Sequence, residues 1–178
     1  SNIYYVTIAT TGSASNHGSL SSLNWNVAGA SGGGGYAYWA GGAPNGGNFV
    51  STIERVAIST SGSSSSFGNL SMNRGATAGV GDNTYIIFAG SGGWSDSGID
   101  QLNAISGGTA TKVGDLHAAK YSHTSATDKT TGLFAGGYGS SMYNNIEKVT
   151  IASAGNAVDV GDLLSGRYRL AGTAGSSS

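Results

Sequence analysis

A short apolar run occurs three times in this sequence and ends each time in small residues. The copies occupy residues 36–42, 85–90 and 131–137. Trp39, Phe88 and Phe134 hold the same position in them, at intervals of 49 and 46 residues. Branched and aromatic runs that close on glycine indicate strands buried on both faces, with backbones approached closely by their neighbours. The repeat predicts three equivalent innermost strands, at residues 36–40, 85–89 and 132–136.

Other segments recur with the same period. An alternating apolar segment occupies residues 3–8, 53–58 and 146–151, with a looser copy at 99–102. A turn of small residues follows, and then a Gly-x-Leu triplet at 18–20, 68–70, 114–116 and 161–163. Four residues beyond each of these leucines, Asn24, Arg74, Lys120 or Arg167 opens a segment of small residues. One period therefore holds four short strands and no helix pattern.

Four strands in a unit of about 45 to 50 residues, with paired glycines closing one strand, are typical of a propeller blade. The motifs Ile-x-x-Val-x-Ile-Ala-Ser, Val-Gly-Asp-Leu, Leu-Ala-Gly and Gly-Leu-Phe-Ala-Gly-Gly resemble kelch-like repeats. More specifically, they are similar to the Gly/Ser/Thr-rich version found in structural and tail-associated proteins of bacteriophages. The resemblance covers essentially the whole chain and implies an all-β fold, a kelch-like β-propeller.

The repeats divide the chain at about residues 1–50, 51–97, 98–144 and 145–178, and the last is truncated before its inner strand. We expect a strand at 170–173, whose inner neighbour would fall near position 181. Three complete repeats and part of a fourth fall short of the smallest closed ring, which needs about four blades. We therefore expect the chain to belong to a longer repeat protein or to a ring completed by another copy.

Composition limits the possible partners. Eight basic residues against nine acidic ones leave a net charge of −1, so no basic face for a nucleic-acid backbone is predicted. No apolar run approaches the roughly 20 residues of a membrane-spanning helix. The chain has no cysteine, so no disulfide framework is predicted.

Two columns of the aligned repeats, that is, two sets of residues at equivalent positions, suggest structural hydrogen bonds. Asp115 and Asp162 share a position with Asn69 and Ser19, and an acceptor there predicts a turn-forming bond to local backbone. The column of Asn24, Arg74, Lys120 and Arg167 predicts a donor at a blade edge that bonds to a turn of the neighbouring blade.

No catalytic or cofactor site is predicted. His17, His117 and His123 lack metal-ligand spacing and are expected at the surface or in turns. Asp96, Asp100 and Asn103 could supply oxygen ligands to Ca²⁺, but they do not match an Asp-x-Asp-x-Asp-Gly loop. No serine stands in a Gly-x-Ser-x-Gly elbow.

The candidate ligand-binding residues are aromatic: Phe49, Trp94, Tyr138 and Tyr143. They lie in the loops that follow the inner strands. In a propeller these loops leave the same rim, so the aromatic rings would gather on one face and stack on sugar rings. The alternative is that the rings shield the rim of the core.

The resemblance implies a non-enzymatic virion protein, outside the cell, in a tail fibre or another tail appendage. Its partners would be other virion proteins, further copies of the chain and host-surface glycans. A purely structural extracellular or capsid-surface assembly protein is the alternative. A carbohydrate-active propeller enzyme of the galactose-oxidase type is disfavoured, because its copper site needs a cysteine.

Overall fold

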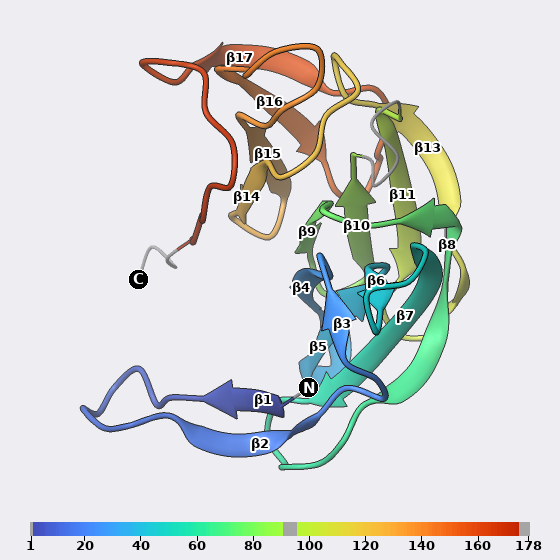
Figure 1. Ribbon diagram of the computed structural model, residues 1–178, viewed down its shortest axis with the longest axis vertical. Helices are drawn as coiled ribbons and strands as arrows, with labels where there is room; N and C mark the ends of the chain where they lie inside the picture. The colour runs from blue at the N-terminus through green and yellow to red at the C-terminus, as the bar shows by residue number, and fades with distance from the viewer. Residues whose placement is uncertain (1, 91–95, 175–178) are drawn as a thin grey trace.

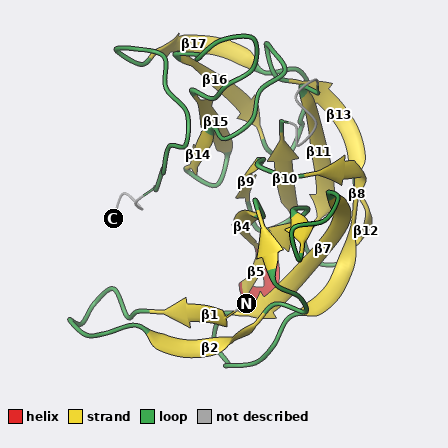
Figure 2. Cartoon of the chain, viewed as in Figure 1, coloured by secondary structure: helices red, strands yellow, loops and turns green. Residues whose placement is uncertain are grey.

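The computed structural model describes residues 2–90 and 96–174. Within these residues the fold is all-β, as predicted, and the one helical element is the 3₁₀ turn η1 (Gly33–Gly35). Figure 2 shows strands joined by loops throughout. In the same part of the chain, no helix is long and apolar enough to cross a membrane.

Three antiparallel sheets form the body of the molecule, and in each of them strands adjacent in sequence lie side by side. Sheet I contains β4 (Ala28–Gly32), β5 (Tyr36–Ala40), β7 (Val50–Ala57) and β8 (Ser65–Arg74). Sheet II contains β9 (Ala78–Gly81), β10 (Tyr85–Ala89), β11 (Gly98–Asn103) and β13 (Thr111–Asp115). Sheet III contains β14 (Thr124–Thr127), β15 (Thr131–Ala135), β16 (Asn145–Thr150) and β17 (Val158–Asp162).

Smaller elements complete the chain. The N-terminal pair consists of β1 (Asn2–Tyr5) and β2 (Ser15–Ser19). A two-residue strand, β12 (Gly108–Thr109), runs parallel to β8, while β3 (Asn24–Trp25) pairs with β6 (Ala43–Pro44). As far as the described residues trace it, the molecule is an open arc, with the N-terminal pair at one end and sheet III at the other (Figure 1).

The innermost strands are not the predicted ones. β5, β10 and β15 are second in their sheets, and β4, β9 and β14 form the concave edge (Figure 1). There a Cβ on Gly79 would lie 2.7 Å from the carbonyl oxygen of Gly29, and Ser125 Oγ donates to the Gly79 carbonyl at 2.8 Å. Where strands of neighbouring sheets converge this closely, only small side chains fit, so the aromatic strands lie one position farther out.

The core lies between the sheets. Phe88 is buried between sheets I and II, and Phe134 between sheets II and III. Trp39 has the same place in sheet I, but it is only half-buried. The sheet before it, the N-terminal pair, has two strands in place of four, so less material covers the indole ring.

A β-bulge recurs in the outer strands. In sheet I, Ile53 pairs with Gly68 but the next residue, Glu54, pairs with Ser66, so Phe67 is extra. The equivalent extra residues are His17, Val113 and Val160. Each precedes the glycine of a Gly-x-Leu triplet. A bulge shifts by one residue the alternation of side chains between the two faces of the sheet. The apolar residues of these strands therefore do not recur at every second position.

The strand predicted at 170–173 does not form. The segment lies beside β14, where a Cβ on Gly172 would approach the carbonyl oxygen of Ser125 at 2.7 Å. It thus continues the series of inner segments made by β4, β9 and β14. Among the described residues no strand lies on its other side to form a ladder, so the segment is not part of a sheet.

Backbone hydrogen bonds join consecutive repeats near the rim from which the loops after β5, β10 and β15 leave; we call this rim the loop rim. Ala76 N donates to Asn26 O at 2.7 Å, Ser122 N to Ala76 O at 2.8 Å, and Arg169 N to Ser122 O at 2.8 Å. All four residues have positive φ, between 52° and 58°. A left-handed residue at this point turns the N–H of one repeat toward the carbonyl of the previous one.

Ala76 has no side chain that compensates for this conformation, so Ala76→Gly should stabilise the fold by about 0.5 to 1 kcal/mol. Relief of the left-handed strain exceeds the added entropy of the unfolded chain. Ala57→Gly, at a strand position with negative φ, is the matched control and should destabilise by about as much. Chemical denaturation measures both, and an A76G protein less stable than the wild type would contradict the argument.

Candidate functional site

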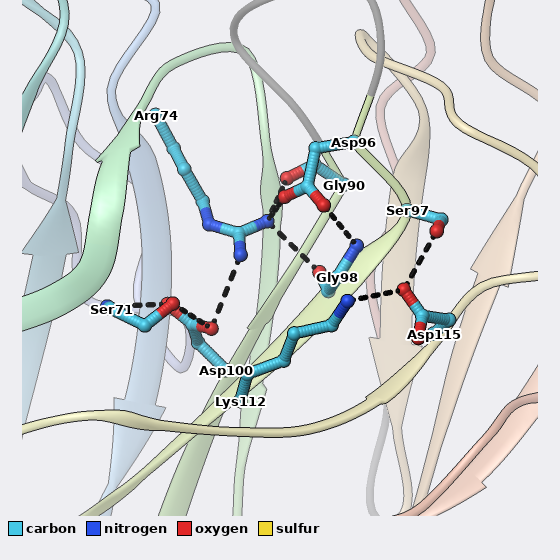
Figure 3. Close-up of polar contacts among 9 residues, drawn as sticks. All are labelled: Ser71, Arg74, Gly90, Asp96, Ser97, Gly98, Asp100, Lys112 and Asp115. Atoms are coloured by element: carbon cyan, nitrogen blue, oxygen red, sulfur yellow. Dashed lines mark hydrogen bonds and ion pairs between the residues drawn. The ribbon is translucent and has the colours of Figure 1, made fainter.

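A buried guanidinium joins sheets I and II. Arg74 ends β8 with 1% of its side chain exposed. Its Nη1 donates to the carbonyls of Gly90 and Gly98 at 2.8 and 3.1 Å (Figure 3). The same group forms ion pairs with Asp96 and, through Nη2 at 3.2 Å, with Asp100. The sequence predicted a donor from this column toward a neighbouring unit, and Arg74 contacts the β10–β11 loop of sheet II.

The acceptor on sheet II is the fully buried Asp100. Besides Arg74, it accepts hydrogen bonds from Ser71 N at 2.8 Å and from Ser71 Oγ at 2.7 Å (Figure 3). The carboxylate is therefore satisfied by two donor residues of sheet I. The Asn103 side chain bonds within its own turn, where its Oδ1 accepts from the backbone N–H groups of Ile105 and Ser106. Of the three residues considered as Ca²⁺ ligands, Asp96 and Asp100 therefore bind Arg74, and Asn103 stabilises a turn.

The next pair of sheets repeats this arrangement. Lys120 forms an ion pair with Glu147, both side chains being fully buried, and His117 N donates to the same carboxylate. In sheet I, Glu54 accepts from Ser21 N at 3.3 Å and Ser64 Oγ at 3.2 Å. Sequence reasoning missed this acidic column, although each acid directly follows the first isoleucine of an alternating segment.

The turn-forming bond predicted for Asp115 is wrong, because this residue lies in β13 and its carboxylate points across the sheet. It accepts from Ser97 Oγ at 2.7 Å and from Lys112 Nζ at 2.8 Å (Figure 3). The bond from Lys112, and then that from Ser97, lowers the pKa of Asp115 below its ordinary value. Asn69 and Asp162 also lie in strands, β8 and β17, and Ser51 Oγ donates to Asn69 at 3.4 Å.

Three tyrosines from different segments pack together at the loop rim. Tyr138 lies between Tyr121, at 5.7 Å between ring centroids, and Tyr168, at 5.5 Å. Tyr121 and Tyr138 also exchange two backbone hydrogen bonds of 3.0 Å. Arg169 places its guanidinium 5.4 Å from the Tyr168 ring. We call Tyr121, Tyr138 and Tyr168 the tyrosine cluster; its rings stay partly exposed.

Desolvation raises the pKa of the Tyr121 hydroxyl above its ordinary value, and the neighbouring Tyr138 and Tyr168 add to the shift. The Tyr121 hydroxyl is therefore neutral near pH 7. The cluster presents aromatic edges and hydroxyl groups beside the cationic Arg169.

Two of the other predicted aromatics, Tyr143 and Phe49, lie in different loops. Tyr143 shares the β15–β16 loop with Tyr138 and places its hydroxyl 3.2 Å from Ser140 Oγ. Phe49, just before β7, lies with its ring against the backbone of Gly75, just after β8. Trp94 falls outside the described residues. The structure therefore brings Tyr138 and Tyr143 onto one loop and places Phe49 on another.

Tyr121 and Tyr168 were missed by the sequence analysis. Each directly follows a member of the Lys120 and Arg167 column, and Trp25, which is 62% exposed, follows Asn24 in the same way. The fourth residue of this series is Gly75, where the Phe49 ring fills the place of the missing side chain. An aromatic residue after the donor column in three of four repeats was the available signal.

The histidines differ from expectation in part. His117 is exposed, but His17 and His123 are buried. His17 Nε2 lies 2.8 Å from the carbonyl oxygen of Ala57. His123 packs against Phe134, and neither ring nitrogen has a well-oriented hydrogen-bond partner among the described residues. Burial and then the charge of Lys120 lower the pKa of His123 to about 3.

A groove of about 840 Å³ follows the concave side of the arc, lined by β4, β9 and β14 and the turns after them. Asp82 and Asp128 are its acidic residues. Each carboxylate accepts two backbone N–H bonds of its own turn, which shapes the hairpins. The groove walls are therefore mainly backbone and small side chains.

No protein-family model matches this chain, and no curated protein matches it either.

Proposed function

We propose that the chain is part of a kelch-like β-propeller of the Gly/Ser-rich kind that occurs in bacteriophage structural proteins. Three sheets, each built on four sequential antiparallel strands with the first strand on a common concave side, support this proposal (Figure 1). So do the repeated bulges and the ion pairs at equivalent positions. Propeller blades have this strand number and order.

In the virion, the protein is a segment of a tail fibre or tail appendage that attaches to host-surface glycans through its loop rim. The observation that carries this proposal is the tyrosine cluster, with partly exposed rings on loops of a rigid scaffold. Tyrosine offers an apolar ring to the C–H face of a sugar and a hydroxyl to its polar edge. A net charge of −1 suits recognition of neutral sugars.

A purely structural role in assembly is the second candidate. The mutual packing of Tyr121, Tyr138 and Tyr168 favours it, because rings that cover one another also close the rim of the core.

Tyr138→Ala combined with Tyr168→Ala should weaken attachment to host cells and to an array of surface glycans by roughly tenfold or more. The estimate takes about 1 kcal/mol for each aromatic contact. Ile105→Ala is the matched control: it removes an exposed apolar side chain, 66% accessible, from the loop after β11, at the opposite rim. Attachment by that variant should equal that of the wild type.

Thermal unfolding of all proteins separates the two candidate roles. If the double variant keeps its melting temperature and loses attachment, the adhesive role holds. If it unfolds at a much lower temperature, or if it folds and attaches normally, the tyrosine cluster belongs to the scaffold and the assembly role is preferred.

A further inference from the structure

Sheet III exposes a surface that its two predecessors bury. Leu133 corresponds to Tyr38 and Ile87, which are both 0% exposed, yet Leu133 is 37% exposed. Ile146 and Leu163 are half-buried, whereas the equivalent isoleucines and leucines of sheets I and II are at most 3% exposed. We call Leu133, Ile146, Leu163 and Arg167 the C-terminal face.

Arg167 shows the same contrast. Arg74 and Lys120, its equivalents, are 1% exposed and bind an acid on the following sheet. Arg167 is exposed, and its guanidinium bonds to Ser165, two residues away. The last sheet thus presents both the apolar and the cationic parts of an intersheet contact.

The opposite end of the arc exposes the complementary half. Tyr4, Val6 and Ile8 are 59%, 57% and 100% exposed, and we call them the N-terminal face. Their equivalents in β11 and beyond, and in β16 and beyond, are buried against the preceding sheet, with at most 4% exposed. These equivalents are Asp100, Leu102 and Ala104 in sheet II, and Glu147, Val149 and Ile151 in sheet III.

We propose that the C-terminal face of one copy of the chain binds the N-terminal face of a second copy, head to tail. The occupant is argued from continuity with contacts that the chain already makes twice. Sheet I packs on sheet II, and sheet II on sheet III, through the residues equivalent to these two faces. One chain carries both halves of a third such contact, at opposite ends of an open arc (Figure 1).

The position that holds a buried carboxylate in the internal contacts is occupied by a tyrosine, Tyr4, in the N-terminal face. In the repeat geometry Arg167 of one copy meets Tyr4 of the other, where the internal contacts have a cation and a carboxylate. A guanidinium packs favourably on a tyrosine ring and can donate to its hydroxyl. The contact therefore buries no carboxylate. Because the two faces differ, the interface is heterologous, and it leads to a closed ring or a filament.

Complementation between variants tests the proposal. Ile8→Lys places a charge on the N-terminal face, and Leu133→Lys places one on the C-terminal face. Each variant alone should sediment as a 17.6 kDa monomer, while the wild type forms larger assemblies. A mixture of the two variants should form a heterodimer, because one intact N-terminal face then meets one intact C-terminal face.

Arg167→Glu is the second C-terminal variant and keeps the test decisive if Leu133→Lys does not fold. A mixture of Leu133→Lys with Arg167→Glu, both altered on the same face, should remain monomeric. Cross-linking gives an independent readout, because the chain has no cysteine of its own. A short bis-maleimide should join Tyr4→Cys to Arg167→Cys and should not join either variant to itself.

Three outcomes would overturn the proposal. They are a wild-type protein that stays monomeric across the concentrations accessible to sedimentation, a mixture of opposite-face variants that does not associate, and cross-links between like faces. None of these results bears on sugar binding by the tyrosine cluster, so the two proposals fail or stand separately.

Discussion

Arg74→Met is expected to destabilise the fold by about 3 to 5 kcal/mol, enough to unfold a domain of ordinary stability. Methionine keeps the apolar stem of the side chain but removes the charge, which leaves the fully buried Asp100 and its neighbour Asp96 without their cation. The carbonyls of Gly90 and Gly98 also lose a donor. Urea denaturation measures the change in the free energy of unfolding.

The exposed pair in the same region is the matched control. Lys112 and Asp115 lie 2.8 Å apart with about half of each side chain exposed. Lys112→Met should therefore destabilise the fold far less than Arg74→Met, because solvent screens the exposed pair. A loss of similar size in the two variants would show that burial does not set the strength of the Arg74 network.

A double variant separates the cost of an orphaned charge from the worth of the pair. Arg74→Met combined with Asp100→Asn keeps an acceptor for Ser71 and removes one buried negative charge. It should be more stable than Arg74→Met alone, because the remaining buried group no longer requires a counter-charge. If the two single losses simply add, Arg74 and Asp100 do not interact energetically.

The stability of the protein should fall as the pH drops from about 6.5 toward 3, and His123 should account for a large part of this loss. The pKa of His123 is lowered to about 3 in the folded protein, whereas an unfolded histidine has its ordinary value near 6.5. Above pH 6.5 both states are neutral. Between these two pH values the unfolded chain binds a proton that the folded chain does not bind. Each pH unit of acidification therefore lowers the free energy of unfolding by roughly 1 kcal/mol or more.

The cause is geometric. His123 is 5% exposed, packs against Phe134, and lies near the charged Lys120, whose partner is Glu147. His123→Leu should therefore flatten the dependence of the free energy of unfolding on pH in this window, relative to the wild type. Leu170 holds the equivalent position in the last repeat, so leucine is compatible with the repeat.

The comparison must isolate one histidine from the carboxylates, which also titrate in acid. The matched control His117→Leu removes an exposed imidazole and leaves the buried carboxylates as they are, so its curve should follow that of the wild type. If the H123L and wild-type curves run parallel from pH 6.5 to 4, the proposed role of His123 is wrong.

The repeat in the sequence was sufficient to predict the β class and most of the strands, although the strand predicted at 170–173 does not form. The apolar runs at residues 36–40 and 85–89 coincide with β5 and β10. Local pattern determines these elements because alternation, chain-breaking glycines and short apolar runs act within a few residues. The donor column of Arg74 and Lys120 was found in the same way, from its constant spacing after leucine.

The order of strands across each sheet did not follow from hydrophobicity. The most apolar strand was placed innermost, but strands of neighbouring sheets converge at the concave edge, where Gly29, Gly79 and Ser125 leave room for them. Steric crowding at that edge outweighs the preference of bulky residues for the centre.

The candidate site, too, could be predicted from sequence only in part. Tyr138 and Tyr143 could be selected from sequence, because they follow the glycine pair at the end of the apolar run that forms β15. Their grouping could not be. Tyr121 and Tyr168 join Tyr138 from segments that precede and follow its sheet, and the partners of Asp96 and Asp100 come from sheet I. Spacing along the chain identifies equivalent positions, but contacts between repeats depend on how one sheet stacks on the next, and this stacking is a property of the folded chain alone.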